Sequence, residues 1–395
     1  MKRDFVTIDD LSDSALASLM DLADRIRSNL RGHAADLPGY LMGSLFLEPS
    51  TRTRLSFEAS MLRLGGRVIT SSDPDTSSSV KGETLADTIR IVDSYVDVTV
   101  LRHPCAGAAR LAARLARGPV INAGDGSHEH PSQTLCDLYT LRSERGPIAA
   151  QTVVLYGDLR YGRTVHSLAR ALVRFGARVL AIADGGLSLP EFVVDDLAGR
   201  PGCGIREVRI NDMEDVFRRR GVEALLIAPE VTLPPAVGAA PLELNLRDQK
   251  VHAIYVTRLQ KERLRGEAHG TSLPILDHRF LRSPTFSDSI VLHPLPRVGE
   301  IARELDTDPR AAYFRQAALG VPIRMALLLW CCGMVDLGAK AAPPARLEAC
   351  TGGACANLGC ITVKEEPGFA EVGRDSDGRL RCLFCEERVS EPSGS

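Results

Sequence analysis

A cluster of hydroxyl and guanidinium groups lies in the segment STRTR (residues 50–54), just after the apolar run LMGSLFLE and just before a helical pattern of apolar residues that starts at Leu55. A helix that follows a strand presents free backbone N–H groups at its N-terminus, where anions bind. Arginine holds phosphate through two parallel hydrogen bonds. The segment therefore has two interpretations: a capped helix start with a solvated basic turn, or an anion site.

Further candidate groups follow two more apolar strands. Arg102 follows VDVTVL, and GDGSHEHPSQ places His130 and Gln133 at the start of another helix, while Lys81 adds a cation in a polar loop. The carboxyl ends of parallel strands meet at one edge of a sheet, which is where ligands of such sheets bind. Three strand ends that each present such a group favour the anion site, with helix capping as a by-product.

The second half of the chain repeats this arrangement. Arg163 follows a strand and a glycine turn in LYGDLRYGRTV, Arg258 and Gln260 follow YVT, and Leu295-Pro296 follows SIVLHP. The glycines do not form G-x-G-x-x-G, and the chain lacks G-x-x-x-x-G-K-[ST], so the usual nucleotide-binding loops are excluded. A cleft lined by arginines from both halves suits two small anionic substrates.

The elements that must position these groups are strands and helices in alternation. Buried apolar strands alternate with helices of 10–15 residues in both halves, which is typical of parallel α/β sheets. The predicted fold is α/β, with two doubly wound parallel-sheet domains in series and a small C-terminal four-cysteine zinc module. The predicted boundaries are 1–134 with a helix at about 320–337 packed back on it, 135–319, a linker at 338–349, the module at 350–390 and a tail at 391–395.

Composition narrows the class of protein. The 395 residues are 44% hydrophobic and carry 48 basic against 50 acidic side chains, a balance that favours neither a nucleic-acid nor a membrane partner. The N-terminus lacks the apolar core of a signal peptide, and the apolar run at 325–335 is too short to span a bilayer. We expect a cytoplasmic protein.

The cysteines indicate a metal site. Five of the ten cysteines lie from Cys350 onward, and four of them form the pattern Cys355-x4-Cys360, then Cys382-x2-Cys385. Four thiolates at this spacing are typical of structural zinc, and a module of this size depends on its metal to fold. Cys350 is a spare that could compete, since it has the same spacing to Cys355. Acidic residues balance the module's basic ones, which argues against a nucleic-acid finger.

The motifs resemble the transcarbamylases, and specifically the catalytic chains of the aspartate carbamoyltransferases. The segments that carry the resemblance run in family order from about residue 5 to 336: STRTRLSFE, KGETLADT, LRHP, GDGSHEHPSQTLCDL, GDLRYGRTVHSL, TRLQKERL and HPLPR. CANLGC and CLFC resemble the zinc domain of the family's separate regulatory chain, here fused to the catalytic chain without the nucleotide-binding domain.

The resemblance implies substrates and roles. Carbamoyl phosphate would bind to Ser50, Thr51, Arg52, Thr53, Arg102, His130, Gln133, Leu295 and Pro296, with Thr53, Arg102 and His130 at its carbonyl oxygen as the catalytic set. L-Aspartate would bind to Arg163, Arg258 and Gln260. Ser77 and Lys81 would reach a neighbouring subunit's site, where both would bind carbamoyl phosphate and Lys81 would also bind aspartate, which makes the active unit a homotrimer. Glu48 and Arg263 would organise the closed cleft, and catalysis needs no cofactor.

Several alternatives stay open. Ornithine enzymes of the family carry a cysteine where this chain has Pro294, so aspartate is favoured over another amine acceptor. The chain could also be an inactive scaffold homologue. A segment of about 217–250 looks like an insertion, either inert or acting on a loop or an inter-trimer contact. We expect the zinc module to dock on its own or a neighbouring catalytic chain, which could build an assembly larger than the trimer. Direct regulation by ATP or CTP would need another site or chain.

Overall fold

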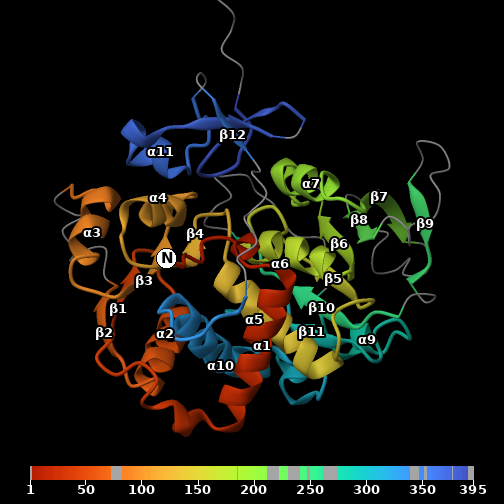
Figure 1. The fold of residues 1–395 in the computed structure, drawn as a ribbon. Coiled ribbons are helices and arrows are strands. Elements are labelled where there is room, and N and C mark those ends of the chain that lie inside the picture. The colour runs from red at the N-terminus through yellow and green to blue at the C-terminus, as the bar shows by residue number, and fades with distance from the viewer. Residues whose placement is uncertain are drawn as a thin grey trace, which may run out of the picture. The chain divides into compact units, whose positions relative to one another are not determined.

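The computed structural model describes residues 2–72, 82–184, 186–210, 222–229, 241–246, 250–260, 275–338, 347–350, 354–375 and 377–389. The chain divides into two compact units (Figure 1). Unit 1 contains Met1–Cys136 and Leu319–Ser395, and unit 2 contains Asp137–Ala318. Among the helices of these described ranges, none is long and apolar enough to cross a membrane.

Unit 1 contains a four-stranded parallel sheet in the order β2-β1-β3-β4. Its strands are the apolar runs expected from the sequence: β1 (Leu41–Phe46), β2 (Arg67–Ser71), β3 (Val98–His103) and β4 (Val120–Asp125). All but the edge strand β2 are largely buried, as parallel strands covered by helices on both faces must be.

Helices cover both faces of this sheet. The right-handed crossover rule places α2 (Thr51–Arg63), between β1 and β2, on one face. The chain then crosses back over the sheet, so α3 (Leu85–Val92) and α4 (Ala108–Leu115) cover the other face (Figure 1). The C-terminal part of α10 (Tyr313–Cys331) packs on α2, where Arg324 Nη1 donates to Ser56 Oγ at 2.7 Å. The first long helix, α1 (Asp13–Ser28), begins with the Ser12 hydroxyl accepting from Ala15 N.

Unit 2 contains a seven-stranded sheet in the order β11-β10-β5-β6-β8-β7-β9. The strands are β5 (Thr152–Tyr156), β6 (Arg178–Asp184), β7 (Cys203–Ile210), β8 (Val222–Pro229), β9 (Leu242–Leu244), β10 (Ala253–Val256) and β11 (Ile290–Leu292). Its described helices are α6 (Arg163–Arg174), α7 (Glu191–Ala198) and α9 (His278–Leu281), while α5 (Pro131–Arg145) spans the division between the units.

The second sheet departs in one respect from the all-parallel expectation. Strand β8 runs antiparallel to both of its neighbours, β6 and β7, whereas β11, β10, β5 and β6 are parallel. The apolar run that forms β8 is the strand expected inside the proposed insertion. Much of the remaining 217–250 segment lies outside the described residues.

The C-terminal module is a three-stranded antiparallel sheet with one short helix. Its elements are β12 (Glu348–Cys350), α11 (Ile361–Lys364), β13 (Val372–Arg374) and β14 (Leu380–Cys382). Strand β12 starts two residues before the predicted boundary at 350. Apolar module residues such as Ile361 and Phe384 share one buried core with Leu85, Ala108 and Leu111 of α3 and α4, so the module belongs structurally to unit 1.

Candidate functional site

The segment 50–54 forms the turn from β1 into α2. Ser50 occupies the N-cap position with a ψ of 87°, but its side chain makes no capping hydrogen bond, so the predicted capping role of this hydroxyl is wrong. Thr51 and Arg52 are exposed, and Thr53 is 7% exposed in the first turn. Arg54 instead contacts its own unit, donating to Ser72. An uncommitted cap hydroxyl beside an exposed guanidinium fits the anion-site interpretation.

Arg102 lies at the carboxyl end of β3 and is held from both neighbouring strands. Its Nη2 is 3.0 Å from Glu48 Oε2, in the residues after β1, and its Nη1 donates to the Ala123 carbonyl of β4 at 3.1 Å. The guanidinium is thereby oriented at the edge where the three strands end. Glu48 compensates part of its charge.

His130 lies between β4 and α5 and is buried, with 4% exposure. Its Nδ1 is 3.3 Å from Ser132 Oγ, and its carbonyl accepts from Gln133 N at 3.0 Å. Strands β1, β3 and β4 are adjacent in the sheet, so the predicted groups after each of them meet at one edge. Ser77, Lys81 and Arg263 lie outside the described residues.

In unit 2, the predicted arginines follow the adjacent strands β5 and β10. Arg163 begins α6 and is 6% exposed, while Arg258 and Gln260 follow β10 and are half-buried. Sequence reasoning missed the residue that ties these two loops together, Asp158. Its carboxylate accepts from Tyr161 N and from Gln260 N, each at 3.0 Å. An acid directly after a strand was the signal that could have found it.

The loop after β11 presents the Leu295-Pro296 pair. Leu295 has a positive φ of 56° and is joined to Pro296 by a cis peptide. His293 Nδ1 accepts from Leu295 N at 2.7 Å, so the proton on Nε2 points to Glu300 Oε1, also at 2.7 Å. Although burial would raise it, the pKa of Glu300 is lowered to about 2 by hydrogen bonds from His293 and nearby backbone N–H groups. His293 and Glu300 are thus supporting residues that sequence reasoning did not assign.

The four predicted metal ligands come together in the module. The sulfurs of Cys355, Cys360, Cys382 and Cys385 all lie within 4.8 Å of one another, with 3.5 Å between Cys355 and Cys385 and 3.8 Å between Cys360 and Cys382. A tetrahedral zinc with Zn–S bonds of about 2.3 Å places its sulfurs about 3.8 Å apart. The backbone N–H of Phe384 donates to Cys382 Sγ, a supporting contact typical of such sites. Cys350 is not in this group.

Two further groups of ligand-type side chains lie where the module meets the rest of unit 1. They are His103 with Cys105 and Glu365, and His128 with Glu129 and Glu386. In the second group, Arg110 Nη2 donates to Glu386 Oε1 at 2.8 Å. Burial alone would lower the pKa of His128, but Asp125 and Glu386 raise it to about 10. Glu386 faces both Arg110 and His128, and His128 also pairs with Asp125, so we describe this group as an ion-pair network.

Two family models match the chain. The carbamoyl-P binding domain of aspartate/ornithine carbamoyltransferase matches residues 3–143, and the Asp/Orn binding domain of the same family matches residues 245–331. The catalytic subunit of aspartate carbamoyltransferase from Thermoplasma volcanium is 44% identical over 329 residues, which cover 82% of this chain and 96% of that protein. The corresponding subunit from Lachnoclostridium phytofermentans is 41% identical over 324 residues, which cover 81% and 94%.

Solved structures agree with these relatives. The catalytic subunit of M. jannaschii aspartate transcarbamoylase is 36% identical with a TM-score of 0.65, covering 82% of this chain and 96% of that one. Aspartate transcarbamoylase from Trypanosoma cruzi in complex with N-(phosphonacetyl)-L-aspartic acid is 35% identical with a TM-score of 0.65, covering 83% and 94%. The family models end before the four-cysteine module.

Proposed function

We propose that this chain, which belongs to the aspartate/ornithine carbamoyltransferase family, transfers the carbamoyl group of carbamoyl phosphate to the amine of L-aspartate, giving N-carbamoyl-L-aspartate and phosphate for pyrimidine synthesis. The observation that carries the proposal is the edge formed by β1, β3 and β4, where the segment 50–54, Arg102 and His130 meet. Relatives more than 40% identical over most of the chain are aspartate carbamoyltransferase catalytic subunits.

The phosphate of carbamoyl phosphate binds to Ser50, Thr51, Arg52 and Thr53 at the N-terminus of α2. Thr53, Arg102 and His130 donate hydrogen bonds to the carbonyl oxygen, and Gln133 with the Leu295-Pro296 backbone holds the carbamoyl nitrogen. A Ser132 hydroxyl that donates to His130 Nδ1 leaves the proton on Nε2, ready for that oxygen. Each such donor contributes roughly 3–4 kcal/mol when negative charge develops on the oxygen.

L-Aspartate binds through its carboxylates to Arg163, Arg258 and Gln260. Its amine attacks the carbamoyl carbon, a tetrahedral oxyanion forms, and the C–O bond to phosphate breaks. The leaving phosphate accepts the proton of the amine, so no protein base is needed, and no covalent bond to the enzyme forms. Holding the two substrates together supplies about 7–11 kcal/mol in favourable systems.

The module holds one structural zinc through Cys355, Cys360, Cys382 and Cys385. The sulfur spacing and the ligand set of four cysteine thiolates support this assignment. Metal analysis should find about one zinc per chain. The Cys350→Ser variant should retain the zinc and the Cys360→Ser variant should lose it. Loss of zinc in Cys350→Ser would mean that Cys350 is one of the ligands.

The active assembly is a trimer in which Ser77 and Lys81 complete a neighbouring subunit's site. Residues 1–134 with the helix at about 320–337 form the carbamoyl phosphate domain and 135–319 the aspartate domain, which the two compact units support. A cytoplasmic location is part of the same proposal.

Initial rates of carbamoyl transfer, with aspartate and ornithine offered in parallel, test the function. Product from aspartate alone is the expected result. Turnover with another amine would change the acceptor assignment and leave the phosphate site in place. No turnover with either, in zinc-loaded and assembled protein, would favour the scaffold alternative.

A further inference from the structure

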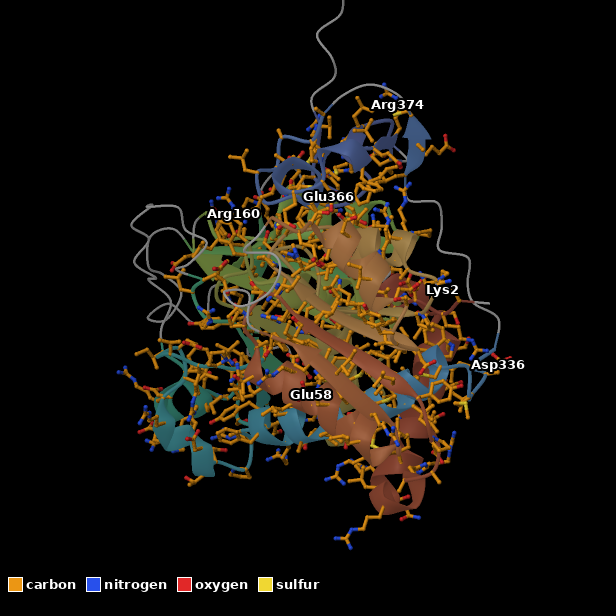
Figure 2. All side chains as sticks on the ribbon, turned by 90° about the vertical axis from the view of Figure 1, so that its left-hand side faces the viewer. Lys2, Glu58, Arg160, Asp336, Glu366 and Arg374 are labelled. Atoms are coloured by element: carbon orange, nitrogen blue, oxygen red, sulfur yellow. The ribbon has the colours of Figure 1, made fainter. Side chains whose placement is uncertain are left out.

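The C-terminal module contacts three segments of unit 1 that contain, or lie within a few residues of, proposed carbamoyl phosphate residues. These segments follow β3, follow β4 and begin α3. Figure 2 labels Glu366, on the side of the module that faces α3, and Arg374, on the opposite side of the module.

The segment after β3 forms a backbone bridge with the module. The Ala106 N–H donates to the Gly359 carbonyl at 2.8 Å, and the Ala106 carbonyl accepts from Ile361 N at 2.9 Å. The next residue, Gly107, has a φ of 83°, and a Cβ there would lie 2.6 Å from Phe384 Cβ. The module therefore approaches the backbone five residues after Arg102 as closely as glycine allows.

The segment after β4 is held through ion pairs. His128 Nδ1 is 3.2 Å from Asp125 Oδ2, and His128 Nε2 is 3.6 Å from Glu386 Oε2. His128 lies two residues before His130, and Glu386 directly follows Cys385. The 103–107 and 125–130 segments also contact each other, since Gly126 N donates to the His103 carbonyl and Gly107 N to Asp125 Oδ2, both at 2.9 Å.

The third contact is at the N-terminus of α3, which begins four residues after Lys81. Thr84 is its N-cap residue but makes no side-chain capping bond. Glu366 Oε1 of the module accepts from Ala86 N at 2.7 Å instead, so a carboxylate from the module caps this helix.

We propose that the four-cysteine module acts within its own chain as a positioning element of the carbamoyl phosphate site, with Glu386 and His128 as the positioning residues that set His130. The inference rests on the proposed function. Glu386 and Ile361 each directly follow a proposed zinc ligand, so the metal that folds the module also fixes these contacts.

The test compares two substitutions in the zinc-loaded full-length protein. Glu386→Gln removes the charge that faces His128 and Arg110. Glu371→Gln is the matched control, because Glu371 pairs with Arg114 of α4 at the same interface, at 2.9 and 3.0 Å, away from the catalytic segments. Glu386→Gln should raise KM for carbamoyl phosphate about tenfold, which is the size of effect expected when one member of a coupled hydrogen-bond and ion-pair network is changed. KM for aspartate and zinc content should stay the same.

A second readout does not depend on turnover. Carbamoyl phosphate, offered without aspartate, should bind more weakly to Glu386→Gln because His130 contacts its carbonyl oxygen, and amide hydrogen exchange should accelerate in peptides that cover 103–107 and 125–130. His128→Asn combined with Glu386→Gln should be no worse than Glu386→Gln alone, since the two side chains act as a pair.

Unchanged KM for carbamoyl phosphate, unchanged carbamoyl phosphate affinity and unchanged exchange in Glu386→Gln would overturn the proposal. Equal effects in Glu371→Gln would also overturn it, because they would reflect docking in general. If the wild-type protein showed no carbamoyl transfer, the proposed function would fail. Carbamoyl phosphate binding and hydrogen exchange would then still decide the positioning role.

Discussion

Individual side chains at the carboxyl ends of β1, β3 and β4 carry the proposed chemistry. Substitution of His130 tests the contribution of one of them. His130→Ala should lower kcat roughly 10²–10³-fold, because it removes one donor to the developing oxyanion. KM for aspartate should change less than about threefold, since that substrate makes no contact with His130 in the proposed mechanism. Steady-state rates give both values, with His33→Ala as the control. A fall in kcat of less than tenfold would remove His130 from the catalytic set.

Asp158 positions the loops that carry the proposed aspartate-binding residues, so its substitution should affect the binding of aspartate. It is 2% exposed and accepts backbone N–H groups from two loops. Asp158→Asn leaves one oxygen for two donors, so KM for aspartate should rise roughly tenfold, as expected when a charged buried hydrogen bond is lost. KM for carbamoyl phosphate should stay constant. If both KM values rose equally, the effect would be on general stability.

At the scale of elements, the loop after β11 depends on the His293–Glu300 pair. Glu300 has its pKa lowered from 4.5 to about 2 in the folded state. A lowered pKa contributes stability that is present above pH 4.5 and is lost as the pH falls toward 2. Glu300→Gln should therefore cost about 2 kcal/mol at pH 7, and its difference in Tm from wild type should narrow as the pH falls below 4.5.

Thermal unfolding at pH 7, 5, 4 and 3 measures this difference. Glu207→Gln, at an exposed position on β7, is the control and should follow the wild-type curve. A Tm gap for Glu300→Gln that is equal at pH 7 and pH 3 would show that the side chain acts through shape and not through charge.

The elements that position the site were largely predictable because apolar runs and helical periodicity are local signals. The apolar runs LMGSLFLE and VDVTVL form β1 and β3, and the strand expected before GDGSHEHPSQ forms β4. Strand direction is not local: the run VEALLIA indicates a strand, and only its pairing with β6 and β7 makes it antiparallel. Helix capping, expected as a by-product of the 50–54 segment, is wrong for Ser50: a serine before a helix is usually a cap, but the Ser50 side chain makes no capping hydrogen bond.

The supporting residues were missed for a related reason. Asp158 gains its role because β5 and β10 are neighbours, although Gln260 lies about a hundred residues later in the chain. The contact between His128 and Glu386 joins residues more than 250 apart. Motifs predict groups that touch a ligand, but the groups that hold them in place follow from tertiary contacts that no local pattern contains.

At the scale of the whole molecule, the proposed trimer makes each site depend on two chains. His130 would belong to one subunit and Lys81 to its neighbour, so His130→Ala and Lys81→Ala should each be nearly inactive as pure proteins. When equal amounts are dissociated, mixed and reassembled, every mixed trimer regains one intact site. Random assembly makes three quarters of the trimers mixed, so activity should recover to about a quarter of the wild-type value.

A second mixture provides the control for this recovery. Thr53 and His130 both lie in unit 1 of one chain, so Thr53→Ala mixed with His130→Ala creates no intact site and should stay inactive. Recovery in both mixtures would mean that the residual activity comes from something other than shared sites. Failure of the Lys81 mixture to recover, with mixed trimers verified by a mass-tagged chain, would mean that each chain builds its site alone. The neighbour would then be needed for stability and not for chemistry.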